Sequence, residues 1–381
     1  MGKQKNWIKL SFCLGLLLVF VISTATVYAK GLSSEQVKQA LEKYRGQSLV
    51  VVSWGGSFQE AQRKALFEPF VKEFGIKLIE DSPSDQAKIK AMVKTNNVTW
   101  DVVDLGSYYP DNLGREGYLE PIDYSIVDKT DLLEKFAGEY HVGTITYSDI
   151  LAYRTDVFPE GKAPTSTADF WDVKKFPGRR SMYALPLSNY TFAMIALGYK
   201  PKDVYPLTDE KIDQIYKKMD EVKPHVTVWW KAGAQPAQLL VDKEVVMASA
   251  WNGRVEKVIR EGAPIKIIWN GAALQGDSWV IPKGAPNKEL AQLFIAWQAL
   301  PEVNWRTSKY ISYGPINKKS FDKVDPLYKG ALPSDFVDQQ VETDFSWWSM
   351  YYSRELELSL IHISEPTRQL TQSRMPASGC K

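Results

Sequence analysis

Short apolar segments alternate with amphipathic segments through most of the 381 residues, and this alternation limits the fold more than any other feature. Residues 48–53 form an apolar run typical of a strand buried on both faces. In residues 57–74, large apolar side chains recur at helical spacing, and Ser57 with Glu60 matches the pattern of a helix capping box. Strands that alternate with helices in this way predict an α/β fold with parallel sheets.

The same alternation continues along both halves of the chain. We expect further strands within 76–81, 101–109, 244–251, 265–270 and 277–286, and helices at 86–95, 209–222, 252–262 and 287–300. The apolar stretch 144–154 has no neighbouring helix, which predicts a strand that crosses from one lobe to another. Two lobes also suit the length of the chain, which is more than one ordinary core usually holds.

The first 29 residues have the composition of a targeting signal. Three lysines precede an apolar run from Leu10 to about Val27, and the run ends on the cleavage-site pattern Val27-Tyr28-Ala29. We therefore expect residues 1–29 to be a cleaved signal peptide, which predicts export. An uncleaved transmembrane anchor is the alternative, because the run is near the lower limit for spanning a bilayer.

The last 24 residues differ in character from the rest of the chain. The segment 358–368, LSLIHISEPTR, resembles the translation of a transposon adapter used in sequencing libraries. The residues after it show no apolar periodicity. We expect residues 358–381 to be non-native and to replace the end of a final helix.

Both terminal segments distort the charge of the chain. The full sequence holds 47 basic and 45 acidic residues, of which residues 1–29 and 358–381 supply six basic and one acidic. Residues 30–357 therefore carry 41 basic and 44 acidic groups, a net charge of −3. A mildly acidic body makes a poor nucleic-acid binder and is compatible with a cationic ligand.

The residue types needed for several kinds of chemistry are scarce. Cys13 and Cys380 lie in the two terminal segments, so the body has neither a disulfide nor a thiol. Only His141 and His225 remain in it, which excludes a metal site with several histidines. The signature motifs of nucleophile-elbow hydrolases, zinc proteases and P-loop proteins are missing. We expect no catalytic activity and no cofactor, with a secreted hydrolase as the alternative.

Large aromatic residues follow several of the predicted strands. Trp54-Gly55-Gly56 comes after the first strand and lacks the spacing of a dinucleotide-binding loop. Trp251 ends another predicted strand, and Tyr108 follows a third. Ligands bind outside the carboxyl ends of the strands in parallel sheets, so these side chains predict one binding crevice. The alternative is that they fill the core.

Several ordered motifs between residues 49 and 348 resemble one protein family. They include SWGGSFQEAQRKALFEPFVKEFG, ADFWDVKKFPGRR, EVVMASAWNGR and WVIPKGAPNKELA. They are similar to the periplasmic solute-binding proteins of spermidine/putrescine-type ABC importers. The resemblance implies a two-lobed, type II periplasmic binding protein fold, with two crossover segments and a ligand cleft between the lobes.

Applied to this chain, the family fold implies lobe 1 at residues 30–148 and 278–320, and lobe 2 at 149–277 and 321–357. It also implies a periplasmic, non-enzymatic receptor that captures a small cationic solute such as putrescine or spermidine. The receptor would close around the solute by a hinge motion and deliver it to an ABC permease in the inner membrane. We expect a monomer that binds no nucleic acid and no metal.

Polyamine receptors of this family hold the ligand in a box of aromatic side chains with acidic groups at its ends. Aromatic faces attract an ammonium group by about 0.5–2 kcal/mol per contact, and carboxylates hold it by charge-assisted hydrogen bonds. In the loop after the first strand, glycine lets the backbone approach the ligand. The resemblance assigns ligand contacts to Trp54, Gly55, Tyr108, Trp251, Asp277 and Tyr313.

The chain departs from the family pattern at two places. Family members often carry a Glu near LSNYTF, where this chain has Asn189, Tyr190 and Thr191, and Gln275 stands where a Trp is common. We therefore expect Thr191 and its neighbours to contact a neutral or hydroxylated end of the ligand. The alternative is a receptor for a mono-cation or a zwitterion, in which Arg254 meets a ligand carboxylate or forms a surface ion pair.

Overall fold

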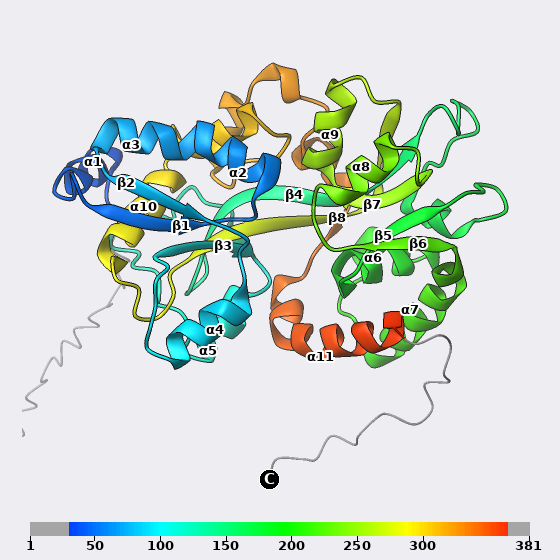
Figure 1. Ribbon diagram of the computed structural model, residues 1–381, viewed down its shortest axis with the longest axis horizontal. Helices are drawn as coiled ribbons and strands as arrows, with labels where there is room; N and C mark the ends of the chain where they lie inside the picture. Colours follow the sequence, from blue (N-terminus) through cyan, green and yellow to red (C-terminus); the bar gives the residue numbers. More distant parts are fainter. Residues whose placement is uncertain (1–29, 365–381) are drawn as a thin grey trace, which may run out of the picture.

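The computed structural model describes residues 30–364, so the predicted signal peptide at 1–29 and residues 365–381 lie outside the described part. Figure 1 shows two lobes joined by two long strands, β4 (Val142–Arg154) and β8 (Ile265–Val280). These strands are the two crossover segments of the expected fold. No helix within residues 30–364 is long and apolar enough to cross a membrane.

Within the described residues, one mixed sheet of nine strands runs through both lobes in the order β2-β1-β3-β8-β4-β7-β5-β6, with β9 paired to β8. The shorter strands are β1 (Ser48–Val52), β2 (Lys77–Asp81), β3 (Val102–Gly106), β5 (Arg180–Tyr183), β6 (Val226–Trp230), β7 (Met247–Trp251) and β9 (Val341–Glu342). The first lobe is built around β1, β2 and β3, and the second lobe around β5, β6 and β7. The exact residue boundaries between the lobes stay a prediction.

The predicted parallel pairing holds within each lobe but not between them. Strand β1 pairs in parallel with β2 and β3, and β5 pairs in parallel with β6 and β7. Strand β8 runs antiparallel to β3 and β4, and β4 runs antiparallel to β7. The expected α/β fold is confirmed, but its strands form one mixed sheet and not purely parallel sheets. An apolar run indicates a strand but not its direction, because both directions bury the same side chains.

The two crossover strands differ in how well the sequence predicted them. The predicted crossing strand is confirmed as β4, in which every residue is buried. The two strands expected at 265–270 and 277–286 are instead one strand, β8. Its register against β4 shifts, since Asp149 lies opposite Ala273 whereas Leu151 lies opposite Ile268. This bulge, which contains Gly271 at φ +84°, explains why the sequence looks like two strands.

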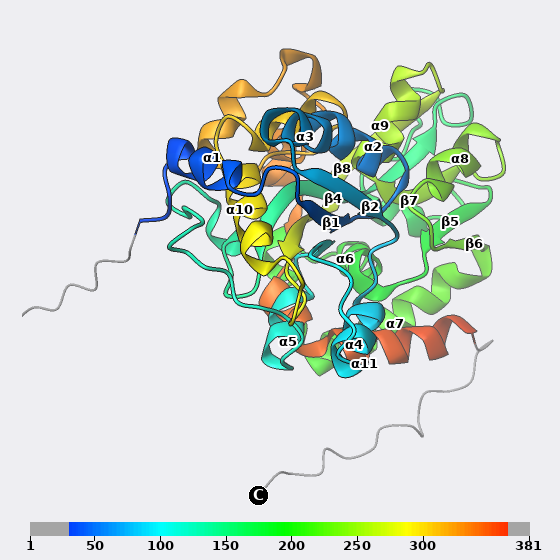
Figure 2. The same ribbon diagram turned by 60° about the vertical axis from the view of Figure 1, so that its left-hand side comes forward.

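Helices cover both faces of the sheet (Figures 1 and 2). They are α1 (Ser34–Glu42), α2 (Gly56–Gln62), α3 (Glu68–Phe74), α4 (Gln86–Lys94), α5 (Pro110–Arg115), α6 (Pro186–Ala196), α7 (Asp209–Val222), α8 (Gln235–Val241), α9 (Asn252–Arg260), α10 (Lys288–Ala299) and α11 (Phe345–Ser364). A π-helical turn, Arg63–Phe67, joins α2 to α3 just before Pro69. Proline has no N–H for the helical ladder, so an irregular turn at this point is expected.

The last helix of the described part, α11, includes the first residues of the predicted non-native segment 358–381. Helix α11 continues past Glu357 to Ser364. Leu358 packs against the main hydrophobic core, and Ser359 is buried. Helix α11 therefore carries the first two residues of the predicted non-native segment against the body, and the non-native origin of residues 358–381 stays a prediction.

Candidate ligand-binding site

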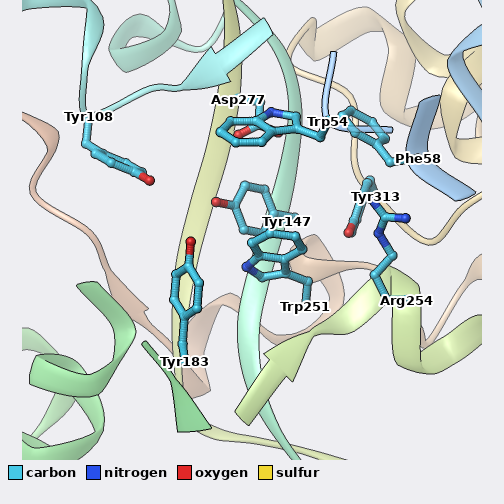
Figure 3. A pocket seen from close by; sticks show the side chains of 9 residues that line it. All are labelled: Trp54, Phe58, Tyr108, Tyr147, Tyr183, Trp251, Arg254, Asp277 and Tyr313. Atoms are coloured by element: carbon cyan, nitrogen blue, oxygen red, sulfur yellow. The ribbon is translucent and has the colours of Figure 1, made fainter. Parts of the chain in front are cut away.

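Seven aromatic and two charged side chains from both lobes enclose a pocket of about 380 Å³, part of it open to solvent (Figure 3). They are Trp54, Phe58, Tyr108, Tyr147, Tyr183, Trp251, Arg254, Asp277 and Tyr313. Aromatic walls with a few polar groups among them are typical of a site for a small molecule.

The strand ends place four of the aromatic rings. Trp54 follows β1, Tyr108 follows β3, Tyr183 is the last residue of β5 and Trp251 is the last residue of β7. Within each lobe the parallel strands bring their carboxyl ends to one edge, and the two edges face each other across the pocket. The prediction that strand-end aromatic residues share one crevice is confirmed for Trp54, Tyr108 and Trp251.

Trp251 is held by other rings on several sides. Its ring centroid lies 6.1 Å from that of Tyr147, 5.9 Å from that of Tyr183 and 5.4 Å from that of Trp230, each in an edge-to-face arrangement. The loop before α8 also approaches closely, because a Cβ on Gly233 would stand 2.0 Å from the Trp251 ring. Only glycine fits there, so the packing fixes the position of the indole.

Tyr313 reaches the pocket from a loop. The backbone N–H of Thr146 donates to the carbonyl of Gly314 at 2.8 Å, which attaches this loop to β4. The Tyr313 ring then packs 5.4 Å from Phe58 and 5.8 Å from Tyr147, measured between centroids. In Figure 3 the hydroxyl groups of Tyr108, Tyr147 and Tyr183 point toward a common space. The pocket therefore offers polar groups as well as ring faces.

Arg254 extends from α9 of the second lobe to the first lobe and is only 5% exposed. Its Nη1 donates to Ser57 Oγ at 2.9 Å, and its Nη2 donates to the Gly55 carbonyl at 3.2 Å. A Cβ on Gly56 would stand 2.8 Å from Nη1, and Gly56 has φ +58°, so glycine is required at this position. The expected capping role of Ser57 is wrong, because α2 begins at Gly56 and the hydroxyl accepts from Arg254 instead.

The Arg254 guanidinium keeps donor capacity beyond these two hydrogen bonds. Its Nε is buried and has no hydrogen-bond partner among the described residues. A guanidinium presents its donors as a planar fork that matches a carboxylate. The expectation of a surface ion pair is wrong, because Arg254 is buried and lines the pocket.

Asp277 supplies the negative charge of the pocket. It lies on β8 opposite Gly106 of β3 and is 6% exposed. Burial raises the pKa of the Asp277 carboxyl to about 7, although the nearby Arg254 charge and Trp54 indole favour the ionised form. The Trp54 Nε1–H lies beside this carboxyl but makes no hydrogen bond of normal geometry. A cation brought next to Asp277 would therefore find a carboxyl close to its titration point.

Two further carboxyl groups are buried near the pocket without lining it. Asp104 accepts a hydrogen bond from Gln62 Nε2 at 2.7 Å, and burial together with the charge of Asp277 raises its pKa well above the ordinary value. Burial also raises the pKa of Asp149 to about 8, although Trp251 and Gln275 favour its ionised form. Neither of these two carboxyl groups lines the pocket, so Asp277 is the carboxyl that a solute in the pocket would meet directly.

Five of the seven predicted contact residues line the pocket, and their role in binding stays a prediction. They are Trp54, Tyr108, Trp251, Asp277 and Tyr313. Gly55, with φ +67°, does not line the pocket itself, but its carbonyl accepts a hydrogen bond from Arg254, which does.

The structure does not bring Thr191 into the pocket. Helix α6 buries its side chain next to the Tyr205 phenol. The neighbouring Asn189 donates to the backbone carbonyls of Tyr183 and Leu185 at 2.7 and 3.0 Å. Tyr190 points away as well, donating to Glu355 at 2.8 Å. The prediction that these residues meet the ligand is wrong, because α6 is buried almost completely and faces the core.

The sequence analysis missed three lining residues, Phe58, Tyr147 and Tyr183. Tyr183 had a usable signal, because it ends the short strand β5 as Trp251 ends β7. Tyr147 lies inside β4 and Phe58 inside α2, where an aromatic residue looks like any core residue. Within residues 30–364, no group of three or more His, Cys, Asp or Glu side chains is arranged to hold a metal ion.

Comparisons with known proteins agree with this geometry. A family model described as bacterial extracellular solute-binding protein matches residues 65–333. The gamma-aminobutyric acid-binding protein of Pseudomonas aeruginosa is 36% identical over 301 residues, which cover 77% of this chain and 84% of that protein. The spermidine/putrescine-binding periplasmic protein of Escherichia coli is 27% identical over 272 residues, covering 68% and 76%.

A solved structure extends the comparison to another kind of ligand. A periplasmic binding protein of A. tumefaciens B6 in complex with glucopine superimposes with a TM-score of 0.78 and 32% identity. The match covers 83% of this chain and 99% of that protein.

Proposed function

The chain belongs to the bacterial extracellular solute-binding proteins, and from that premise we propose that it captures a small zwitterion with one ammonium and one carboxylate group. γ-Aminobutyric acid represents this class and is the named ligand of a relative with 36% identity. As a solute-binding protein the chain is a receptor and not an enzyme, which removes the hydrolase alternative.

One observation carries the proposal, namely that a buried arginine and a buried aspartate line the same pocket. Arg254 offers a fork of donors to a carboxylate, and Asp277 offers a carboxylate to an ammonium group. Each buried charge is more stable with a partner of opposite sign, and a zwitterion supplies both partners at once.

Both charges lie beside one loop of the first lobe, which favours a short solute. Arg254 contacts the carbonyl of Gly55, and Asp277 lies beside the indole of Trp54, so the two groups flank consecutive residues of one loop. The aromatic faces between them cover the methylene groups of the solute and attract its ammonium end.

A polyamine is the second candidate, and the three buried carboxyl groups Asp104, Asp149 and Asp277 favour it. Against it stands Arg254, because a second ammonium group in a pocket of this size would lie near a like charge with little water to screen it. Putrescine should therefore bind less tightly than a solute with a carboxylate in place of one ammonium group.

We further propose that the receptor acts in the periplasm as a monomer and delivers its solute to an ABC permease. Family membership and the predicted signal at residues 1–29 support the location. The two lobes and the pocket between them support a hinge that closes around the solute before docking.

Isothermal titration calorimetry with a matched set of four-carbon solutes tests the proposal. γ-Aminobutyrate, putrescine, butylamine and butyrate share their chain length and differ only in their end groups. We expect γ-aminobutyrate to bind at least tenfold more tightly than each of the others. Putrescine binding equal to or tighter than γ-aminobutyrate would overturn the zwitterion assignment in favour of the polyamine.

A further inference from the structure

Helix α11 lies across both lobes. It runs along one side of the molecule between α5 of the first lobe and α6 and α7 of the second, at the bottom of Figures 1 and 2. It contacts both α5 and α6. Apart from the crossover strands β4 and β8, it therefore makes a separate connection between the lobes.

On the side of the first lobe, α11 supports a pocket residue. The ring of Tyr352 lies 5.4 Å from that of Tyr108, measured between centroids, and 4.6 Å from that of Tyr109. Tyr108 and Tyr109 are themselves 4.4 Å apart. Arg115 of α5 donates to Ser349 Oγ at 3.1 Å. Tyr108 therefore both lines the pocket and packs on α11.

On the side of the second lobe, α11 is anchored by buried hydrogen bonds. Glu355 is fully buried, and it accepts from the Tyr190 hydroxyl at 2.8 Å and from the Tyr216 hydroxyl at 3.5 Å. About two turns earlier, Trp348 Nε1 donates to the Tyr205 hydroxyl at 2.7 Å. A buried carboxyl with two hydroxyl partners resists displacement, because moving it would leave polar groups unpaired.

These contacts share one face of the helix. Trp348, Tyr352 and Glu355 are spaced by four and three residues, so their side chains point the same way. A helix is stiff over this distance, and a shift at Glu355 is passed on to Tyr352. The helix thus holds the Tyr352 ring, which contacts Tyr108, at a fixed distance from Glu355, which is buried against the second lobe.

We propose that α11 positions the pocket residue Tyr108 relative to the second lobe, with Tyr352 and Glu355 as positioning residues. The helix then couples the separation of the lobes to the shape of the ligand pocket. This inference rests on the proposed function for its effect on binding, but its effect on the Tyr108 segment is independent of any ligand.

Four variants separate this role from general stability. Tyr352→Leu removes the ring behind Tyr108 and keeps an apolar side chain. Tyr190→Phe removes a hydroxyl from Glu355 without touching the pocket. Tyr351→Leu changes the adjacent tyrosine, which is 36% exposed, and is the matched control. Tyr352→Phe keeps the ring and is the conservative rescue.

The first measurement is hydrogen–deuterium exchange of residues 106–115 in the solute-free protein. We expect faster exchange there in Tyr352→Leu, a smaller increase in Tyr190→Phe, and unchanged exchange in Tyr352→Phe and Tyr351→Leu. Exchange that rises equally throughout the chain, or that is the same in Tyr352→Leu and Tyr351→Leu, would overturn the proposal. If Tyr352→Leu does not fold, Tyr190→Phe against Tyr351→Leu decides the question.

The second measurement is the dissociation constant for γ-aminobutyrate. We expect it to rise roughly threefold to tenfold in Tyr352→Leu, as for the loss of one aromatic contact, and to stay unchanged in Tyr351→Leu. Equal affinity in both variants would show that α11 does not position the binding residue. If the unaltered protein binds none of the four solutes, the proposed function fails, while the exchange comparison still decides the role of α11.

Discussion

The two walls of the pocket resemble each other in shape and differ in charge. Each wall has a tryptophan at the end of a parallel strand, Trp54 after β1 in the first lobe and Trp251 at the end of β7 in the second. Next to the first tryptophan lies the carboxyl of Asp277, whereas Arg254 begins one turn beyond the second tryptophan and extends its guanidinium across to Gly55 and Ser57 of the first lobe. Under the proposed function, the aromatic faces common to both walls would cover the apolar part of the solute, and the two charges would set its orientation.

The largest expected effect comes from Arg254→Ala. Truncating one partner of a buried charge pair costs about 2–5 kcal/mol of binding free energy, and we expect the upper part of that range because the same side chain also joins the lobes through Ser57 and Gly55. Calorimetry with γ-aminobutyrate measures the loss. Butylamine has no carboxylate, so its affinity should fall much less, and an equal loss for both solutes would contradict the assignment of Arg254 to the carboxylate.

Asp277→Asn should weaken the binding of γ-aminobutyrate by about 2–3 kcal/mol, which is in the lower part of the same range. The pKa of about 7 means that the carboxyl is only partly ionised at neutral pH, so part of its attraction is already absent. The matched solute here is butyrate, which lacks the ammonium group and should bind the variant at least as well as the unaltered protein. A stronger loss for butyrate than for γ-aminobutyrate would reverse the proposed orientation.

The titration of Asp277 also predicts a pH dependence. Because burial raises the pKa from 3.8 to about 7, the ammonium group meets a charged partner above pH 7 and a neutral acid below it. We expect the affinity for γ-aminobutyrate to fall by up to tenfold per pH unit below about 7. Calorimetry from pH 5.5 to 8 measures this trend, and Asp277→Asn should make it much flatter.

The same pKa shift has the opposite pH dependence for the stability of the solute-free protein, which should fall as the pH rises. An acid whose pKa is raised by folding holds its proton more tightly in the folded state, so its contribution to stability is complete below about pH 4 and is lost as the pH rises toward 7. Asp277→Asn should therefore raise the melting temperature of the solute-free protein more at pH 7.5 than at pH 5. A variant that is less stable than the parent at both pH values would contradict this.

Trp251→Ala should have a smaller effect than either charge substitution. It removes one ring face and its attraction for an ammonium group, about 0.5–2 kcal/mol. Thr191→Ala is the matched control and should leave the affinity unchanged, because Thr191 packs beside Tyr205 outside the pocket. Fluorescence competition or calorimetry measures both. A loss in Thr191→Ala equal to that in Trp251→Ala would mean that α6 reaches the solute after all.

The sequence predicted most helices and strands and part of the pocket lining, but it did not predict all of the lining residues. Periodicity located β4 and the helices, and the strand-end rule brought Trp54, Tyr108 and Trp251 to one crevice. The same rule also fits Tyr183, the last residue of β5, but no strand was predicted at this four-residue segment, so the rule was not applied there. Family resemblance placed Asp277 and Tyr313 correctly in the pocket but misplaced Thr191, because spacing along α6 does not reveal which face of the helix meets the core.

The sequence by itself determined the elements that repeat locally: apolar runs that become strands, apolar faces that become helices, and aromatic residues at strand ends. Only the tertiary structure decided the direction of β8, the burial of Arg254 and its meeting with Asp277. The physical reason is that these features depend on contacts between residues far apart in the chain. From the sequence, Arg254 looks like a solvated arginine on an amphipathic helix. In the structure it is buried, because the glycines after Trp54 leave room for its guanidinium against the opposite lobe.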